Sequence, residues 1–119
     1  MPQTLLCIDD EPSIGALHKL IFELHGYRVL VANSGPEGLR LLEQEPVDLI
    51  ILDYRMPEMT GDQVAELART RCPEIPILME SAYTDLPESV LKHVDAYLVK
   101  GDSTEALVKK VKSLLKRRE

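Results

Sequence analysis

The sequence lacks tryptophan and has few other aromatic residues, so aliphatic side chains must supply most of its core. Its 119 residues include one phenylalanine and four tyrosines, while hydrophobic residues together make up 45%. Only two cysteines are present, Cys7 and Cys72, and they form no CxxC pair or recognisable disulfide framework, which fits a reducing compartment. No signal peptide is evident, and no run of about 18 apolar residues could cross a membrane. We therefore expect a cytoplasmic protein without a membrane span.

An excess of basic residues is also missing, which argues against direct binding of nucleic acid. The formal net charge is -6, from 20 acidic and 14 basic residues, whereas phosphate backbones attract clustered cations. One basic cluster lies near the C-terminus and consists of Lys109, Lys110, Lys112, Lys116, Arg117 and Arg118. Because an apolar stripe runs along the same segment, and because cations suit a helix C-terminus, we interpret this cluster as the solvated face of a helix.

Five short apolar runs alternate with segments of helical periodicity along the whole chain. The runs are residues 5–8, 29–32, 47–52, 75–79 and 96–99. They are apolar almost continuously, which is typical of strands that are covered on both faces. The alternation predicts an α/β fold of five βα units around a central parallel sheet, in one domain that spans residues 1–119.

The predicted helices have recognisable starts and apolar positions, with one exception. The first is expected to begin near Pro12, and the last after Asp102, with Glu105 completing a variant of the capping box. A helix around residues 85–93 has only a weak apolar pattern. The expected apolar faces are Ile14, Leu17, Ile21 and Leu24 in the first helix, Leu39 and Leu42 in the second, Val64, Leu67 and Ala68 in the third, and Leu107, Val108, Val111, Leu114 and Leu115 in the last.

Polar side chains follow the apolar runs at the points where the predicted strands end. Asp9 and Asp10 follow the first run, Asp53 the third, Ser81 the fourth and Lys100 the fifth. Parallel sheets bind ligands outside the carboxyl ends of their strands, so these groups should converge on one rim. Clustered carboxylates repel one another and require a cation, and oxygen ligands suit Mg²⁺, with Mn²⁺ as an alternative. A carboxylate can also act as a nucleophile and form an aspartyl phosphate.

At these positions the sequence resembles the receiver domains of two-component response regulators, including the single-domain chemotaxis type. The resemblance covers essentially the whole chain and rests on an ordered set of segments: residues 8–11 (IDDE), 53–57 (DYRMP), Gly61, 79–82 (MESA) and 97–100 (YLVK). It implies a flavodoxin-like, three-layer (βα)₅ fold with strand order 2-1-3-4-5. It also implies a phosphoacceptor switch in two-component signal transduction rather than an enzyme. The phosphoryl donor would be a histidine kinase or a histidine phosphotransfer protein.

The resemblance assigns roles in phosphorylation and metal binding to four residues. Asp53 matches the phosphoacceptor, which is also a metal ligand. Asp10 matches the acidic residue that binds Mg²⁺ directly, and Asp9 matches its neighbour, which acts largely through water. Arg55 matches the position whose backbone carbonyl completes the metal site.

Three further residues match the parts of the family that bind and report the phosphoryl group. Lys100 matches the lysine that pairs with the phosphoryl oxygens. Ser81 matches the hydroxyl that turns toward them, and Tyr97 matches the aromatic residue whose rotamer follows that turn. The resemblance implies that the fourth helix, fifth strand and fifth helix bind a downstream protein or a second copy of the chain.

Two positions depart from the family pattern. Gly101 stands where a proline, usually preceded by a cis peptide, is common. A cis bond without proline costs about 2.5–4 kcal/mol, so we expect a trans or more mobile loop beside Lys100. Glu80 stands where an apolar strand residue is usual, and we expect its carboxylate near the strand end, either in water or paired.

Three residues with reactive side chains are expected to have no special role. His18 and His25 lie two turns apart in the first predicted helix, but no carboxylates accompany them at the spacing of a metal site. We interpret both as ordinary helix residues. Cys7 lies in the first apolar run and is expected to be a small core residue.

Other function classes fit the sequence less well. The main alternative is an interaction module with the receiver fold that works without phosphorylation, but a binding surface alone would not need the set Asp10, Asp53, Ser81 and Lys100. A phosphohydrolase with an aspartate nucleophile would have a second aspartate where Arg55 stands. A carrier of flavin mononucleotide would not place acidic residues 9–11 in its phosphate loop.

Overall fold

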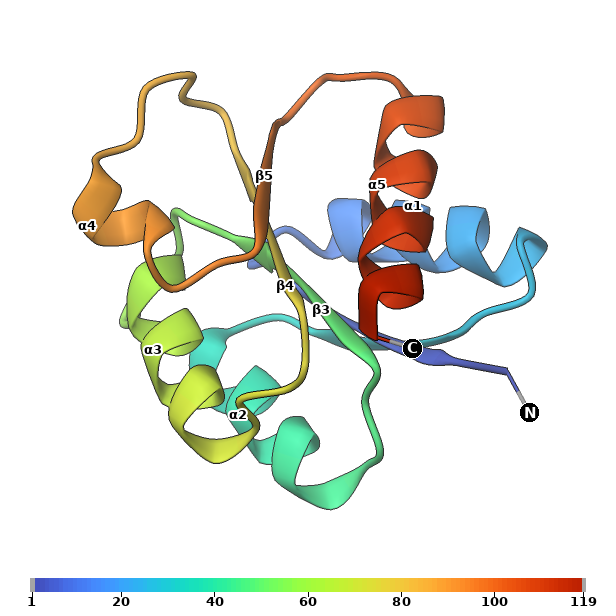
Figure 1. The fold of residues 1–119 in the computed structure, drawn as a ribbon, viewed down its shortest axis with the longest axis horizontal. Helices are drawn as coiled ribbons and strands as arrows, with labels where there is room; N and C mark the ends of the chain where they lie inside the picture. The colour runs from blue at the N-terminus through green and yellow to red at the C-terminus, as the bar shows by residue number, and fades with distance from the viewer. Residues whose placement is uncertain (1, 119) are drawn as a thin grey trace.

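The computed structural model describes residues 2–118 of the chain, and the side chains of residues 2–117. Met1, Glu119 and the side chain of Arg118 in the predicted basic cluster lie outside this description. Strands and helices alternate throughout (Figure 1): β1 (Thr4–Ile8), α1 (Pro12–Leu24), β2 (Arg28–Ala32), α2 (Gly35–Gln44), β3 (Leu49–Asp53), α3 (Gly61–Arg71), β4 (Ile77–Ser81), α4 (Glu88–Leu91), β5 (Ala96–Val99) and α5 (Thr104–Arg118).

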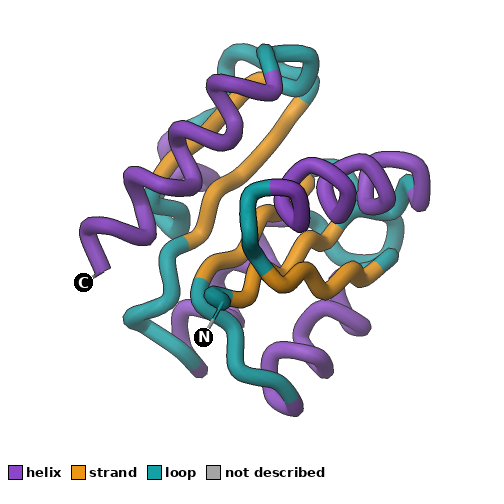
Figure 2. The backbone as a smooth tube through the Cα atoms, turned by 90° about the vertical axis from the view of Figure 1, so that its right-hand side faces the viewer, coloured by secondary structure: helices purple, strands orange, loops and turns teal. Residues whose placement is uncertain are grey.

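The five strands form one parallel sheet in the order β2-β1-β3-β4-β5, which confirms the predicted topology. Helices cover both faces, as Figure 2 shows. On one face α1 and α5 pack over a cluster that includes Leu5, Phe22 and Val111, and on the other α2, α3 and α4 cover a cluster that includes Ile50, Val64 and Met79. None of the helices within residues 2–118 combines the length and apolar character needed to cross a bilayer.

Two strands are displaced toward the C-terminus: β3 begins two residues later than predicted and ends one later, and β4 begins and ends two residues later. β3 ends at Asp53 and β4 at Ser81, so these polar residues belong to the strands rather than to the loops. Pro76 explains the late start of β4, because proline has no N–H to donate to a ladder. Its carbonyl accepts from Ile50 N at 3.0 Å, and the regular pairing starts at Ile77.

The apolar face predicted for α1 is only partly right: Ile14 and Ile21 are half-buried, but the two leucines are exposed. The buried residues of this helix are Gly15, His18 and Phe22, whereas Leu17 is 50% and Leu24 is 77% exposed. Gly15 is the reason, because it lies directly against β2, where a Cβ would be 2.6 Å from a methyl carbon of Val31. The helix approaches the sheet most closely on its glycine side, and its leucine side faces away from the core.

The other helices follow the predictions more closely. In α2, Ser34 accepts a hydrogen bond from Glu37 N at 3.2 Å, and the predicted Leu39 and Leu42 are buried. In α3, Val64 and Ala68 are buried, but Leu67 is 39% exposed. The five apolar positions predicted for α5 are all buried.

The predicted cap of α5 is displaced by one residue. The helix begins at Thr104, and Ser103, rather than Asp102, caps it by accepting from Ala106 N at 3.1 Å. A shorter hydroxyl side chain is an equally good cap, and the Asp102–Glu105 spacing alone did not distinguish them. The weakly patterned segment at residues 85–93 contains a single helical turn, α4.

The start of α3 requires glycine because it meets the end of β3. Gly61 N donates to Tyr54 O at 2.7 Å, and a Cβ on Gly61 would lie 2.4 Å from Asp53 O. Both contact atoms belong to the backbone, so they cannot yield as a flexible side chain would. This glycine therefore fixes the backbone that carries Asp53.

Replacing Gly61 with alanine is expected to lower the free energy of unfolding by about 1–3 kcal/mol, because the added methyl overpacks the backbone of β3. Urea denaturation followed by circular dichroism measures the change. Ser113→Ala, on the exposed face of α5, serves as the control and should change stability by less than about 0.5 kcal/mol. Equal stability of Gly61→Ala and wild type would contradict this packing.

Candidate functional site

Three carboxylates meet at the carboxyl edge of the sheet. Asp9 directly follows β1, Asp53 ends β3, and the pairing of Ile8 with Leu52 brings these two strand ends side by side. One oxygen each from Asp9, Asp10 and Asp53 lies within 4.8 Å of the others. Asp9 and Asp53 are 3% and 5% exposed, whereas Asp10 is more open to solvent. Such a cluster has a strong negative potential.

Lys100 supplies the positive charge at this cluster. It follows β5, where its backbone N–H donates to Ser81 O at 2.7 Å. Its ammonium lies 3.0 Å from Asp9 Oδ2 and 3.0 Å from Asp53 Oδ1. The other oxygen of Asp9 accepts from Glu11 N at 3.0 Å, so both oxygens of Asp9 are engaged. The structure thus brings together four of the residues predicted from the sequence.

The environment shifts the ionisation of both partners upward. Burial, together with the charges of Asp9 and Asp10, raises the pKa of Asp53 to about 6, although the hydrogen bond and the charge of Lys100 oppose the shift. Burial would lower the pKa of Lys100, but its hydrogen bonds to Asp53 and Asp9 outweigh this and the pKa is raised. The lysine therefore stays charged, whereas the ionised form of Asp53 is less stable than that of an exposed aspartate.

This donor set fits a hard divalent cation. Three carboxylate oxygens within 4.8 Å of one another can contact a common ion, and oxygen ligands with remaining water positions suit Mg²⁺ or Mn²⁺. Asp10 has the most accessible carboxylate of the three. Asp9 has both oxygens in hydrogen bonds within the protein, which agrees with an indirect role through water.

An open cavity of about 270 Å³ adjoins Asp53. Arg55, Ser81, Tyr83 and Lys100 are among its lining residues. Ser81 is buried and its hydroxyl accepts from Tyr83 N at 3.0 Å. The guanidinium of Arg55 lies over the ring of Tyr83, 5.2 Å from its centroid. The cavity gives a small anionic group access to Asp53, Ser81 and Lys100 together.

Tyr97 does not line this cavity. It is half-buried in β5 and packs against the cluster on the α3 and α4 side of the sheet, and its hydroxyl donates to Tyr83 O. Tyr83 therefore connects Tyr97 with Ser81 through one short loop. The sequence did not indicate this role of Tyr83.

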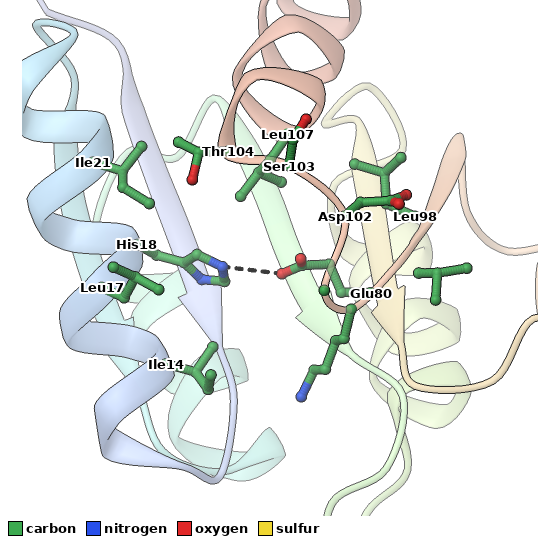
Figure 3. A pocket seen from close by; sticks show the side chains of 13 residues that line it. Ile14, Leu17, His18, Ile21, Glu80, Leu98, Asp102, Ser103, Thr104 and Leu107 are labelled. Carbon is green, nitrogen blue, oxygen red and sulfur yellow. Dashed lines mark ion pairs between the residues drawn. The ribbon is translucent and has the colours of Figure 1, made fainter.

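His18 has a specific partner that the sequence did not indicate. His18 is 5% exposed, and its Nε2 lies 3.1 Å from Glu80 Oε1 (Figure 3). Glu80 is 9% exposed, and pairing was one of the two outcomes expected for it. The signal in the sequence was a charged residue in an apolar strand, which implies a buried partner. Helix periodicity did not identify that partner, because the predicted face of α1 was rotated.

Two smaller expectations are confirmed. Within residues 2–118 every peptide bond is trans, including the one before Gly101, which adopts a positive φ of 95°. Cys7 is fully buried in the core, and burial raises the pKa of its thiol, so it remains protonated. It acts as a small apolar residue.

The sequence matches the family of response regulator receiver domains over residues 5–112. The chain belongs to this family. A receiver domain is a phosphoacceptor switch of two-component signalling rather than a classical enzyme, and the group Asp9, Asp10 and Asp53 is typical of its acidic pocket. The family predicted from the sequence is thereby confirmed.

Among proteins with sequence similarity, the transcriptional regulatory protein GlrR of Escherichia coli is 37% identical over 118 residues. The alkaline phosphatase synthesis transcriptional regulatory protein PhoP of Bacillus subtilis is 35% identical over 122 residues. These alignments cover 96% and 100% of this chain, but 26% and 51% of the two regulators. The chain thus spans a quarter to a half of the length of these relatives.

Solved structures of receiver domains share the fold throughout. A CheY-like receiver domain protein from Methanospirillum hungatei has a TM-score of 0.94 and 31% identity, covering 99% of this chain and 97% of that one. The response regulator TrrA from Thermotoga maritima, in complex with Mg²⁺ and BeF, has a TM-score of 0.86 and 34% identity, covering 94% and 98%.

The raised pKa of Asp53 predicts a pH dependence for metal binding. A cation requires the deprotonated carboxylate, so Mg²⁺ affinity should be steady above pH 7 and fall as pH drops through about 6, approaching tenfold per unit below it. Isothermal titration calorimetry between pH 5 and 8 measures this profile. In Asp53→Asn the step near pH 6 should disappear. An unchanged Mg²⁺ affinity from pH 7.5 to 5 in wild type would contradict the assignment.

Proposed function

We propose that Asp53 is the phosphoacceptor of this receiver domain and that it works with a divalent cation held by Asp10, Asp53 and the backbone carbonyl of Arg55. The observation that carries the proposal is the position of Asp53. It is a buried carboxylate beside two others, paired with Lys100 at 3.0 Å, and open to a cavity. A purely structural aspartate would not need this surrounding charge.

In the proposed reaction, a carboxylate oxygen of Asp53 attacks the phosphorus of a phosphohistidine. The new O–P bond forms as the P–N bond breaks, and the imidazole leaves with the bonding electron pair and takes up a proton from solvent. The ammonium of Lys100 moves from Asp53 to a phosphoryl oxygen, and the Ser81 hydroxyl donates to another. A bound cation would offset the charge between the carboxylates and the phosphoryl group.

The identity of the metal and of the partners rests on the family and on this chemistry. TrrA was solved with Mg²⁺ and BeF, and the oxygen ligands here suit Mg²⁺ best, with Mn²⁺ as the alternative. A receiver domain implies a cognate kinase, so the donor is a histidine kinase or a histidine phosphotransfer protein in the cytoplasm. An interaction module that works without phosphorylation is the alternative function.

Asp53→Asn is expected to abolish acid-labile phosphorylation, because an amide is a far weaker nucleophile and metal ligand than a carboxylate. Incubation with acetyl phosphate and Mg²⁺, followed by intact-protein mass spectrometry, measures incorporation. Asp48→Asn, at another acidic residue outside the site, is the matched control and should be phosphorylated like wild type. Full incorporation in Asp53→Asn, or in wild type with excess chelator, would refute the proposal.

The proposed output surface is the face formed by α4, β5 and α5, for a downstream protein or a second copy of the chain. A phosphoryl group at Asp53 would draw the Ser81 hydroxyl away from Tyr83 N, where it now lies at 3.0 Å. Tyr83 also accepts the hydrogen bond of Tyr97, so its loop couples the site to β5. Because α4 is one turn long, this region has little local structure to resist a change.

Amide chemical shifts with and without beryllofluoride and Mg²⁺ test this surface. The largest changes away from Asp53 are expected in residues 82–91 and around Tyr97, because these segments share the Tyr83 link. Tyr97→Phe, which lacks the hydroxyl, should reduce the changes in β5 and leave those near Asp53 intact. Changes confined to the neighbours of Asp53 would refute the switch surface and leave phosphate acceptance standing.

A further inference from the structure

A fourth carboxylate lies beside the acidic cluster, on the same face of the sheet. Asp53 and Glu80 are register partners in neighbouring strands. Residues two positions earlier, Ile51 and Leu78, both belong to the cluster under α1 and α5. Because side chains alternate along a strand, Asp53 and Glu80 project toward this same side. Glu80 therefore lies next to the site, although it is not one of the three residues of the acidic cluster.

Lys100 lies within reach of this carboxylate. Leu98 is the register partner of Glu80 and packs on the cluster under α1 and α5. Lys100 comes two residues later, so its side chain starts on the same face, diagonal to Glu80. Both residues line one cavity of about 270 Å³ between α1 and the start of α5 (Figure 3). Lys100 also lines the cavity at Asp53, so this residue borders both spaces.

His18 at present holds the Glu80 carboxylate. The two side chains are 3.1 Å apart and nearly buried, and no other ion pair involving Glu80 occurs in the described part of the chain. The second ring nitrogen of His18 has no hydrogen-bonding partner among the described residues. The contact with Glu80 is thus the polar interaction of this imidazole among the described residues, and it occupies one oxygen of the Glu80 carboxylate.

We propose that Glu80 is an alternative counter-ion for Lys100, and that His18 limits its availability. The inference rests on the proposed function, because the need for it arises from metal binding. Lys100 now occupies oxygens of Asp9 and Asp53, and a divalent cation must compete for the same carboxylates. A half-buried ammonium released from them would lose its partners, which is costly. Glu80 offers a negative charge at the place to which the ammonium can turn.

The surroundings of Lys100 permit this movement. Its stem has four rotatable carbons, and the next residue is Gly101, with a positive φ of 95° and no atom within 4 Å of the position where a Cβ would stand. The loop is therefore not packed against other elements at this point. Glu80 is a positioning residue in this scheme, since it acts through Lys100 and not on the phosphoryl group.

The test is a double-mutant cycle on Mg²⁺ affinity, measured by isothermal titration calorimetry on the full chain. Glu80→Gln keeps the shape and a hydrogen bond to His18 but removes the charge, so affinity should fall about three- to tenfold. His18→Leu frees the Glu80 carboxylate, so affinity should rise about threefold. In a Lys100→Met background no ammonium competes with Mg²⁺ for the carboxylates. The changes in affinity caused by Glu80→Gln and by His18→Leu should therefore each be smaller by at least about threefold.

The two variants should change Mg²⁺ affinity in opposite directions. If the His18–Glu80 contact had only a structural role, breaking it from either side would change the affinity in the same direction. Shifts of equal sign, or shifts as large in Lys100→Met as in wild type, would overturn the inference. Should His18→Leu fold poorly, the Glu80→Gln and Lys100→Met cycle decides alone. Glu43→Gln, an exposed acid on α2, is the control and should change affinity by less than about twofold.

Phosphorylation separates this inference from the proposed function. Wild type and Glu80→Gln should both be labelled on Asp53 by acetyl phosphate at saturating Mg²⁺. If Asp53 is phosphorylated but the Glu80 and Lys100 substitutions show no coupling in Mg²⁺ affinity, only the role of Glu80 is overturned. Failure of the wild-type protein to take up a phosphoryl group overturns the proposed function itself.

Discussion

Three carboxylates at the carboxyl edge of the sheet repel one another, and Lys100 is the cation that holds them together in this structure. Asp9 and Asp53 are nearly buried, so their charges are poorly screened by water and the pKa of Asp53 rises to about 6. A divalent cation between these carboxylates would reduce their mutual repulsion.

The sheet creates this repulsion through its register. Parallel pairing of β1, β3 and β4 brings Asp9, which follows β1, to the same end of the sheet as Asp53 and Glu80, and α1 covers the same side. Gly61 lets α3 start against the backbone of Asp53, which fixes the carboxylate from the opposite side. The backbone therefore determines where the carboxylates lie, and the side chains of Lys100 and His18 pair with them.

Much of this arrangement could be predicted from the sequence. The apolar runs and their polar ends give the topology and bring Asp9, Asp10, Asp53, Ser81 and Lys100 to one rim, since alternation and parallel pairing are local rules. The rotation of α1 could not be predicted, because the close approach at Gly15 is a tertiary contact. The same wrong helix face explains why the partner of His18 was missed, because its pairing with Glu80 depends on which side of α1 meets the sheet.

The claim that Asp53 carries the phosphoryl group is tested most directly by mapping the modified residue. After treatment with acetyl phosphate and Mg²⁺, borohydride reduction converts an aspartyl phosphate to homoserine, and peptide mass spectrometry then locates the change. The account predicts homoserine at position 53 and unmodified aspartate at positions 9 and 10. Reduction at position 9 or 10 with Asp53 unchanged, or no reduced residue at all, would contradict it.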